Sequence, residues 1–183
     1  MSGRAVGLCA LLLAAAVAGR AAEPAVVDFE AATPLGAEQK ANRYPRWEEK
    51  GVVFALAHEP RQSKGKGLLM FFTHLESGRK GLLSAMATEP IPVRATFPGP
   101  VSAVTVTFWG STGVPAVLEA FDAEGKLVDR AALAAVPGRK APGEPVPVFP
   151  LTVKGDRIAW IQFSGPRAGE YLAADEVRFV PVN

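Results

Sequence analysis

Few residues in this chain could carry out acid–base or metal chemistry. It has two histidines in 183 residues: His58 stands beside Glu59, and His74 lies two residues before Glu76. Residues two apart share one face of a strand, so His74 and Glu76, with His58, are the groups that a zinc site would use. Nothing in the sequence fixes them in space, and a histidine beside a glutamate in a loop is ordinarily a solvated pair. We expect no metal-dependent or catalytic centre at these residues.

Other catalytic signatures are missing from the sequence. Ser84, Ser111 and Ser164 lack the Gly-x-Ser-x-Gly context of a hydrolase nucleophile. The segment 110–113, Gly-Ser-Thr-Gly, lacks the lysine of a phosphate-binding loop and is typical of a turn. The paired carboxylates of a glycosidase could arise by chance among 18 acidic residues. We therefore predict a protein that is not an enzyme.

Composition excludes several further classes of protein. The chain carries 20 basic and 18 acidic residues, a net charge of +2, which is too small an excess to predict a nucleic-acid partner. It is 49% hydrophobic and 21% charged, as globular domains are. Its single cysteine excludes a disulfide framework and any multi-cysteine metal site. These values predict a globular domain.

Residues 1–21 have the pattern of a secretory signal peptide. Arg4 precedes the apolar segment 5–18, and small residues follow it. At about 14 residues this segment is shorter than the roughly 20 that a membrane-spanning helix needs. Removing the leader also removes Cys9 and leaves 22–183 as the mature chain, which has no further long apolar run. We predict a secreted or periplasmic protein without a membrane span.

The mature chain is predicted to be all β. Short runs rich in β-branched and aromatic residues alternate with clusters of Gly and Pro, and the run 101–109 alternates Val or Phe with Thr. A polar turn ending in Gly125 predicts a hairpin, and Pro145, Pro147 and Pro150 confine their strand to an edge or an irregular position. The expected strands are 26–30, 51–57, 67–74, 82–87, 93–97, 101–109, 114–121, 126–133, 146–153, 157–163 and 172–180. Ten or so closely spaced strands without a linker or repeat indicate one domain, a sandwich or a barrel.

Four segments of the mature chain carry a resemblance to a known group. They are 27–31 (Val-Asp-Phe-Glu-Ala), 119–128, 158–165 and 174–179. Together they resemble the galactose-binding-like jelly rolls and carbohydrate-binding modules of secreted bacterial proteins. The resemblance implies a two-sheet antiparallel β-sandwich of jelly-roll type. It also implies binding of carbohydrate or cell-envelope glycan, although a fold alone does not settle function.

The resemblance further implies a structural calcium ion between the first and last strands. The matching positions are Glu30 and Asp175, with Asp28 and Glu176 as additional partners. Calcium takes six to eight oxygen ligands, and acidic strand ends brought together would repel each other without a cation. The alternative is that these carboxylates face solvent or pair with Arg and Lys.

A sugar-binding surface would need exposed aromatic rings, because a pyranose offers its C–H face to them. The candidates are Tyr44, Trp47, Trp109, Trp160 and Tyr171. In the strand 157–163, Trp160 and Gln162 are expected on the face opposite Ile161 and Phe163. The alternative is that these aromatic rings belong to the core, where large apolar side chains usually lie.

Three basic segments could attract a polyanion or an anionic cell surface if they converge. They are Arg43 with Arg46, residues 61–66, and Arg79 with Lys80. The alternative is that they are solvated loop tips. Taken together, the sequence favours an exported, non-catalytic binding or accessory module for glycan. The alternative function is a structural or protein-interaction sandwich with no small ligand.

Overall fold

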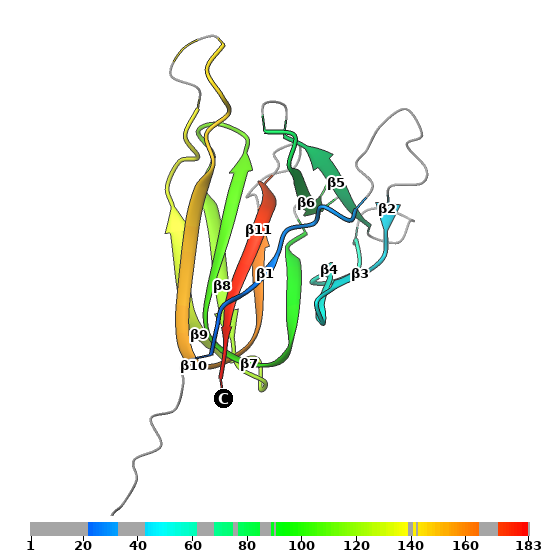
Figure 1. The fold of residues 1–183 in the computed structure, drawn as a ribbon, viewed down its shortest axis with the longest axis vertical. Helices are drawn as coiled ribbons and strands as arrows, with labels where there is room; N and C mark the ends of the chain where they lie inside the picture. Colours follow the sequence, from blue (N-terminus) through cyan, green and yellow to red (C-terminus); the bar gives the residue numbers. More distant parts are fainter. Residues whose placement is uncertain are drawn as a thin grey trace, which may run out of the picture.

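The computed structural model describes residues 22–32, 43–61, 68–74, 77–84, 89, 91–138, 141, 143–164 and 172–182 (Figure 1). The predicted signal peptide, residues 1–21, lies outside this part of the chain. The described residues form eleven strands and no helix. It follows that they contain no helix long and apolar enough to cross a membrane.

Every strand pairing is antiparallel, and the order along the sheet is β2-β5-β6-β11-β7-β10-β8-β9. Strand β1 pairs with β11, and β4 pairs with β3 and β7. The strands are β1 (Ala25–Val27), β2 (Arg43–Tyr44), β3 (Trp47–Glu49), β4 (Val52–Leu56), β5 (Leu69–Thr73), β6 (Lys80–Ser84), β7 (Val93–Gly110), β8 (Ala116–Phe121), β9 (Leu127–Leu133), β10 (Phe149–Ser164) and β11 (Leu172–Pro181).

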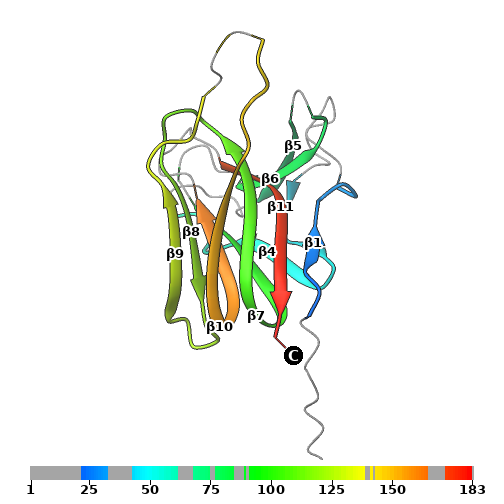
Figure 2. The same ribbon diagram turned by 60° about the vertical axis from the view of Figure 1, so that its left-hand side comes forward.

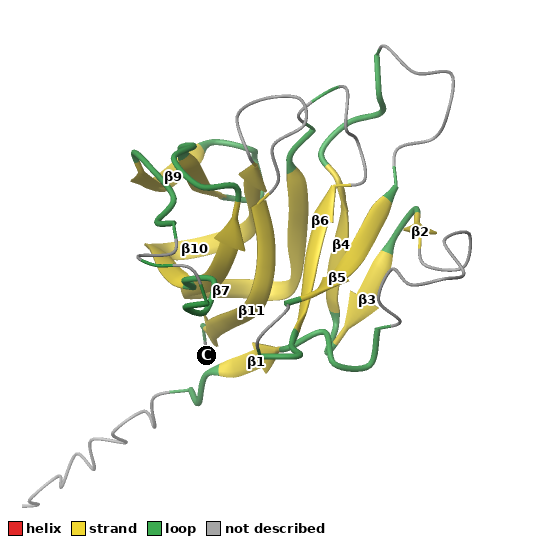
Figure 3. Cartoon of the chain, turned by 90° about the horizontal axis from the view of Figure 1, so that it is seen from above, coloured by secondary structure: helices red, strands yellow, loops and turns green. Residues whose placement is uncertain are grey.

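Two long strands, β7 and β10, pass through both layers of a sandwich. The β8 layer contains β3, β4, the first part of β7, the last part of β10, β8 and β9. The β11 layer contains the first part of β10, the last part of β7, β11, β1, β6, β5 and β2. In Figure 2, β9, β8, β10, β7, β11 and β1 follow one another from left to right, and Figure 3 shows the strands from above. The predicted all-β sandwich is confirmed.

The continuity of β7 and β10 corrects the expected boundaries. The runs 93–97 and 101–109 form one strand, although Pro98, Gly99 and Pro100 separate them. Strand β10 likewise continues through a register shift between Lys154 and Ile158. Interruptions of the strand pattern in the sequence therefore mark bends, where one strand passes from one layer to the other. The strand does not end there, because it is hydrogen-bonded to neighbouring strands on each side of the bend.

Short polar strands are the elements that the sequence pattern missed. Strands β2 and β3 lie in a segment expected to be a polar loop, because two or three residues are too few to show alternation. The Pro-rich run was predicted correctly: the first part of β10, which contains Pro150, pairs with β7 alone and forms an edge of the β11 layer.

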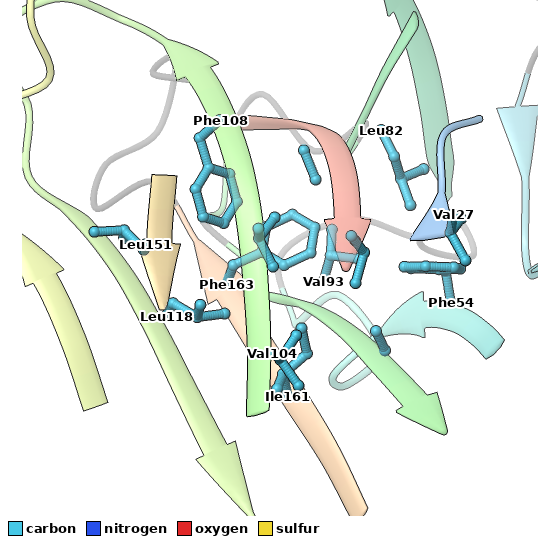
Figure 4. Close-up of a cluster of buried hydrophobic side chains, with 14 of the residues drawn as sticks. Val27, Phe54, Leu82, Val93, Val104, Phe108, Leu118, Leu151, Ile161 and Phe163 are labelled. Carbon is cyan, nitrogen blue, oxygen red and sulfur yellow. The ribbon is translucent and has the colours of Figure 1, made fainter. Parts of the chain in front are cut away.

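The core lies between the two layers (Figure 4). Alternate residues of β7 enter it, and Val104, Val106 and Phe108 are fully buried, as the sequence pattern predicts. Phe108 lies 5.3 Å from Phe163 of the β8 layer and 5.9 Å from Phe149 of the β11 layer, measured between ring centroids. Burying such a ring contributes roughly 1.5–3 kcal/mol, so this cluster fixes how the layers pack.

Candidate functional site

The acidic residues of the last strand lie at a β-bulge. In β11, Ala174 is opposite Phe108 of β7 and Glu176 is opposite Thr107, so Asp175 is an extra residue without an opposing partner. The bulge buries Asp175, which is 2% exposed, even though an aspartate is rarely found in the interior unless it is paired.

Arg79 supplies the positive charge at this bulge. Its Nε lies 3.2 Å from Asp175 Oδ1, and its Nη2 donates to Glu176 Oε2 at 3.4 Å. The first contact is a charge pair rather than an aligned hydrogen bond. Glu176 also accepts a hydrogen bond from Arg178. Burial raises the pKa of Asp175, the Arg79 charge opposes that effect, and Glu176 adds to it.

The acidic residues of the first strand meet a second cation, Lys80. The Lys80 backbone N–H donates to Glu30 Oε1 at 3.2 Å, and its ammonium donates to the Glu30 carbonyl. Asp28 Oδ1 accepts the backbone N–H of Glu30 at 3.2 Å. Glu30 is close enough to Asp175 to raise the pKa of that carboxyl. The structure therefore brings these strand ends together, as the resemblance implied.

The calcium site at these carboxylates stays a prediction. Arg79 is paired with Asp175 and Glu176, and the Lys80 backbone N–H donates to Glu30. Within the described ranges, no group of three His, Cys, Asp or Glu side chains is placed to hold a metal. The sequence analysis counted Arg79 and Lys80 among the basic loops, but only the fold places them against these acids.

Three of the predicted aromatic ligands pack against the interior. Trp109 is 6% exposed and meets His74 edge to face, with 5.3 Å between ring centroids. Tyr44 and Trp47 are partly buried against the core, and both contact Phe71, at 5.6 Å and 5.0 Å between centroids. These packing partners explain the positions of the three rings without a ligand. Tyr171 lies outside the described residues.

Trp160 has a different environment, on the outer face of the β8 layer. Ile161 is fully buried and Trp160 half-buried, so the predicted alternation along this strand is confirmed. The Trp160 ring stacks on Phe121 of β8, with 3.9 Å between centroids and 9° between planes. The guanidinium carbon of Arg94, in β7, lies 4.0 Å from the Trp160 ring centroid. Because Phe121 and Arg94 flank the indole, its edge is what remains for a ligand.

Two rows of side chains cross this outer face. The strand registers place a row that is apolar except for Thr96 beside a polar row, since residues opposite one another point to the same side of a sheet. In the polar row, Gln162 Nε2 donates to Glu119 Oε2 at 2.8 Å, and Arg130 Nε lies 3.4 Å from Glu119 Oε1. We call these eight residues the two-row face: Thr96, Trp160, Phe121 and Leu127, then Arg94, Gln162, Glu119 and Arg130. The sequence predicts that Trp160 and Gln162 share one face of their strand. Their neighbours on that face can be identified only from the pairing registers of the strands.

The histidines have local partners. His74 is buried, and its Nδ1 accepts the backbone N–H of Ser77 at 3.3 Å. Its Nε2 therefore carries the proton and donates to the Val146 carbonyl at 3.1 Å. His58 is exposed, with Nδ1 3.0 Å from the Glu59 carbonyl. The proposed partner Glu76 lies outside the described residues.

The basic segments are only partly described. Arg46 pairs with Glu48 at 2.7 Å. Arg79 and Lys80 are engaged with the acidic strand ends, as given above. Residues 62–67 lie outside the described part of the chain. The polyanion hypothesis for these three segments stays a prediction.

Comparisons with solved structures find similar folds in domains of other proteins. The K2 cleaved adhesin domain of Lys-gingipain is similar over 87% of this chain and 98% of that domain, with a TM-score of 0.52 and 10% identity. The family 11 carbohydrate-binding module of a cellulosomal cellulase from Clostridium thermocellum covers 89% of this chain, with a TM-score of 0.41 and 9% identity. An exo-beta-agarase covers 75% of this chain with 24% of its own length, a TM-score of 0.45 and 13% identity.

The first of these likenesses shows a shared fold. It confirms the resemblance to the galactose-binding-like jelly rolls at the level of architecture. No family profile matches the sequence, and no curated protein matches it.

Proposed function

We propose that this protein is an exported, non-catalytic binding module that holds a glycan chain on the two-row face. The observation that carries the proposal is the pairing of the two rows: ring edges beside a row of hydrogen-bonding groups, on the open side of a sheet. Sugars present apolar C–H groups and hydroxyl groups together, so a surface that alternates both kinds of contact suits them.

The dimensions of the face support an extended ligand. Neighbouring strands lie about 4.8 Å apart, so the rows cross four strands, from β7 to β9, over about 14 Å. The side chains are already held by one another, because Gln162 and Arg130 both bind Glu119. Binding groups fixed in this way lose little conformational entropy when a ligand arrives.

The carboxylates of the face support a non-catalytic role. Glycoside hydrolysis needs two carboxyl groups on opposite sides of the scissile bond. Glu119 is the single acid among the eight residues of the two-row face, and Gln162 and Arg130 bind it. Export is proposed from the leader pattern of residues 1–21.

Strand β9 favours a second candidate function, docking of a protein partner. It ends the sheet, and Leu127 and Val128 are 48% and 38% exposed. An edge strand with exposed apolar side chains can accept another strand.

Affinity electrophoresis of the full mature chain tests the first proposal. The gels contain β-1,4-galactan, xylan, mixed-linkage glucan or polygalacturonate. We expect retardation by at least one of them, and a loss of about two- to twelvefold in affinity for Trp160→Ala, since an aromatic ring contact contributes about 0.5–1.5 kcal/mol. Trp160→Phe, which keeps a ring between Arg94 and Phe121, should retain most of the binding.

A matched control lies on the other layer. Thr152 is exposed there and contacts Thr105, with 2.9 Å between hydroxyl oxygens, so Thr152→Ala should bind as the wild type does. If the wild type passes through every gel unretarded, the glycan proposal fails and β9 becomes the better candidate. Equal losses in Trp160→Ala and Thr152→Ala would also contradict it.

A further inference from the structure

Arg94 lacks the counter-charge that a partly buried cation normally has. Its side chain is half-buried on the two-row face, over the Trp160 ring. Within the described part of the chain, no carboxylate or hydrogen-bond acceptor contacts it, and its Nε is fully buried without a partner. The ring offsets some of the lost hydration, but a cation–π contact is worth only about 0.5–2 kcal/mol. Removing a guanidinium from water without an anion is therefore unfavourable.

The acid on this face is not within reach of Arg94. The strand registers place Gln162 next to Arg94, and Glu119 beyond Gln162. Two strand spacings, about 10 Å, separate Arg94 from Glu119. Glu119 is also committed to Gln162 and Arg130. Among the residues that the structure describes, none therefore supplies an anion to the position beside Arg94.

We infer that Arg94 is the subsite for an oxyanion carried by an acidic glycan, a carboxylate or a sulfate group. This inference rests on the proposed function, because it places the glycan on the two-row face. A guanidinium is planar and donates two parallel hydrogen bonds to a carboxylate or similar oxyanion. Stacking on Trp160 fixes the plane of the guanidinium before the ligand binds, and the incoming anion supplies the missing charge.

The test compares three polysaccharides and three proteins at about 0.15 M salt, where distant charges are screened. The probes are polygalacturonate, a sulfated galactan and neutral β-1,4-galactan. The proteins are the wild type, Arg94→Gln and Arg130→Gln. Arg130 is the matched control, because it lies on the same face with the same charge but is already paired with Glu119.

We expect the wild type to bind at least one acidic probe more tightly than the neutral one. Arg94→Gln should lose ten- to a hundredfold affinity for it, as expected for a charge-assisted hydrogen-bonded pair. The ratio of acidic to neutral affinity should therefore fall in Arg94→Gln, and Arg130→Gln should reduce that ratio much less. The probe that shows the difference identifies the anion as carboxylate or sulfate. Unfolding temperatures of the variants check that each one folds.

The outcomes separate this inference from the proposed function. Binding of neutral galactan with no preference for either acidic probe would overturn the Arg94 inference and leave the glycan proposal standing. Equal losses in Arg94→Gln and Arg130→Gln would also overturn it, because they would indicate non-specific charge attraction. Failure to bind any of the three probes, together with the wider panel above, would overturn both.

Discussion

The ion pair at the β11 bulge should make a measurable contribution to stability, and Arg79→Gln tests it. The substitution keeps a polar side chain but shortens it and removes its charge. It leaves Asp175, which is 2% exposed, without a counter-ion beside Glu176. A buried carboxylate that loses its partner destabilises the folded state, because its hydration is already lost.

The size of the effect follows from the geometry. At 3.2 Å and an effective dielectric constant of about 20, the Coulomb attraction is about 5 kcal/mol before desolvation. Arg79 is 42% exposed, so water screens the pair and its net contribution is smaller. Breaking fully buried pairs costs about 3–5 kcal/mol, and we expect about 2 kcal/mol for Arg79→Gln. In a chain of this size that corresponds to a fall of about 4–8 °C in the unfolding temperature.

Urea unfolding followed by tryptophan fluorescence measures this change at neutral pH. The matched control is Arg178→Gln, since Arg178 also contacts Glu176 but is 58% exposed, and it should cost much less than Arg79→Gln. Because Arg79 already places a positive charge beside Asp175 and Glu176, calcium and a chelator should give the wild type the same unfolding temperature. A loss below about 0.5 kcal/mol in Arg79→Gln, or a clear stabilisation of the wild type by calcium, would refute the reasoning.

Two further predictions concern the same end of the sandwich. Because burial raises the pKa of Asp175, the folded state favours its protonated form, so the stability that this group contributes is lost as the pH rises through its folded-state pKa. Asp175→Asn should therefore gain stability relative to the wild type as the pH rises above the ordinary pKa of an aspartate, about 3.9, in urea titrations, and a difference independent of pH would contradict this assignment. Gly81→Ala should cost about 1–3 kcal/mol in thermal unfolding, because its Cβ would lie 2.8 Å from Trp109 Nε1 and 3.0 Å from Ala173 Cβ. Gly99→Ala, where nothing lies within 4 Å of the added Cβ, should be nearly neutral, and equal losses at the two glycines would show that the clash is not the cause.

The hairpin between β8 and β9 shows why much of the fold could be predicted. Its two runs alternate in polarity, and the turn between them ends in Gly125, which has a φ of 81°. A side chain other than glycine rarely adopts that conformation, so a local signal fixes the turn. Strands β2 and β3 could not be predicted, because only their neighbours β5 and β4 hold them in the sheet.

The candidate site was harder to predict because its contacts join distant segments. The acidic residues of the first and last strands were singled out in the sequence, but their partner Arg79 is 97 residues from Glu176. Likewise, alternation placed Trp160 on an outer face, whereas its contacts with Phe121 and Arg94 depend on the registers of three strands. A register is a tertiary property, and a shift of one residue would turn every one of these side chains to the other side.

The sequence by itself determined the all-β character, the hairpin and the faces of individual strands, because these follow from a two-residue period and from turn chemistry within a few residues. Tertiary structure alone decided which charges meet and which stay unpaired. Arg79 reaches Asp175 because a bulge in β11 buries that carboxylate, and Arg94 lies over Trp160 without an acidic contact among the described residues. The energies of charges depend on distance and burial, and both are set only when strands far apart in the sequence pack together.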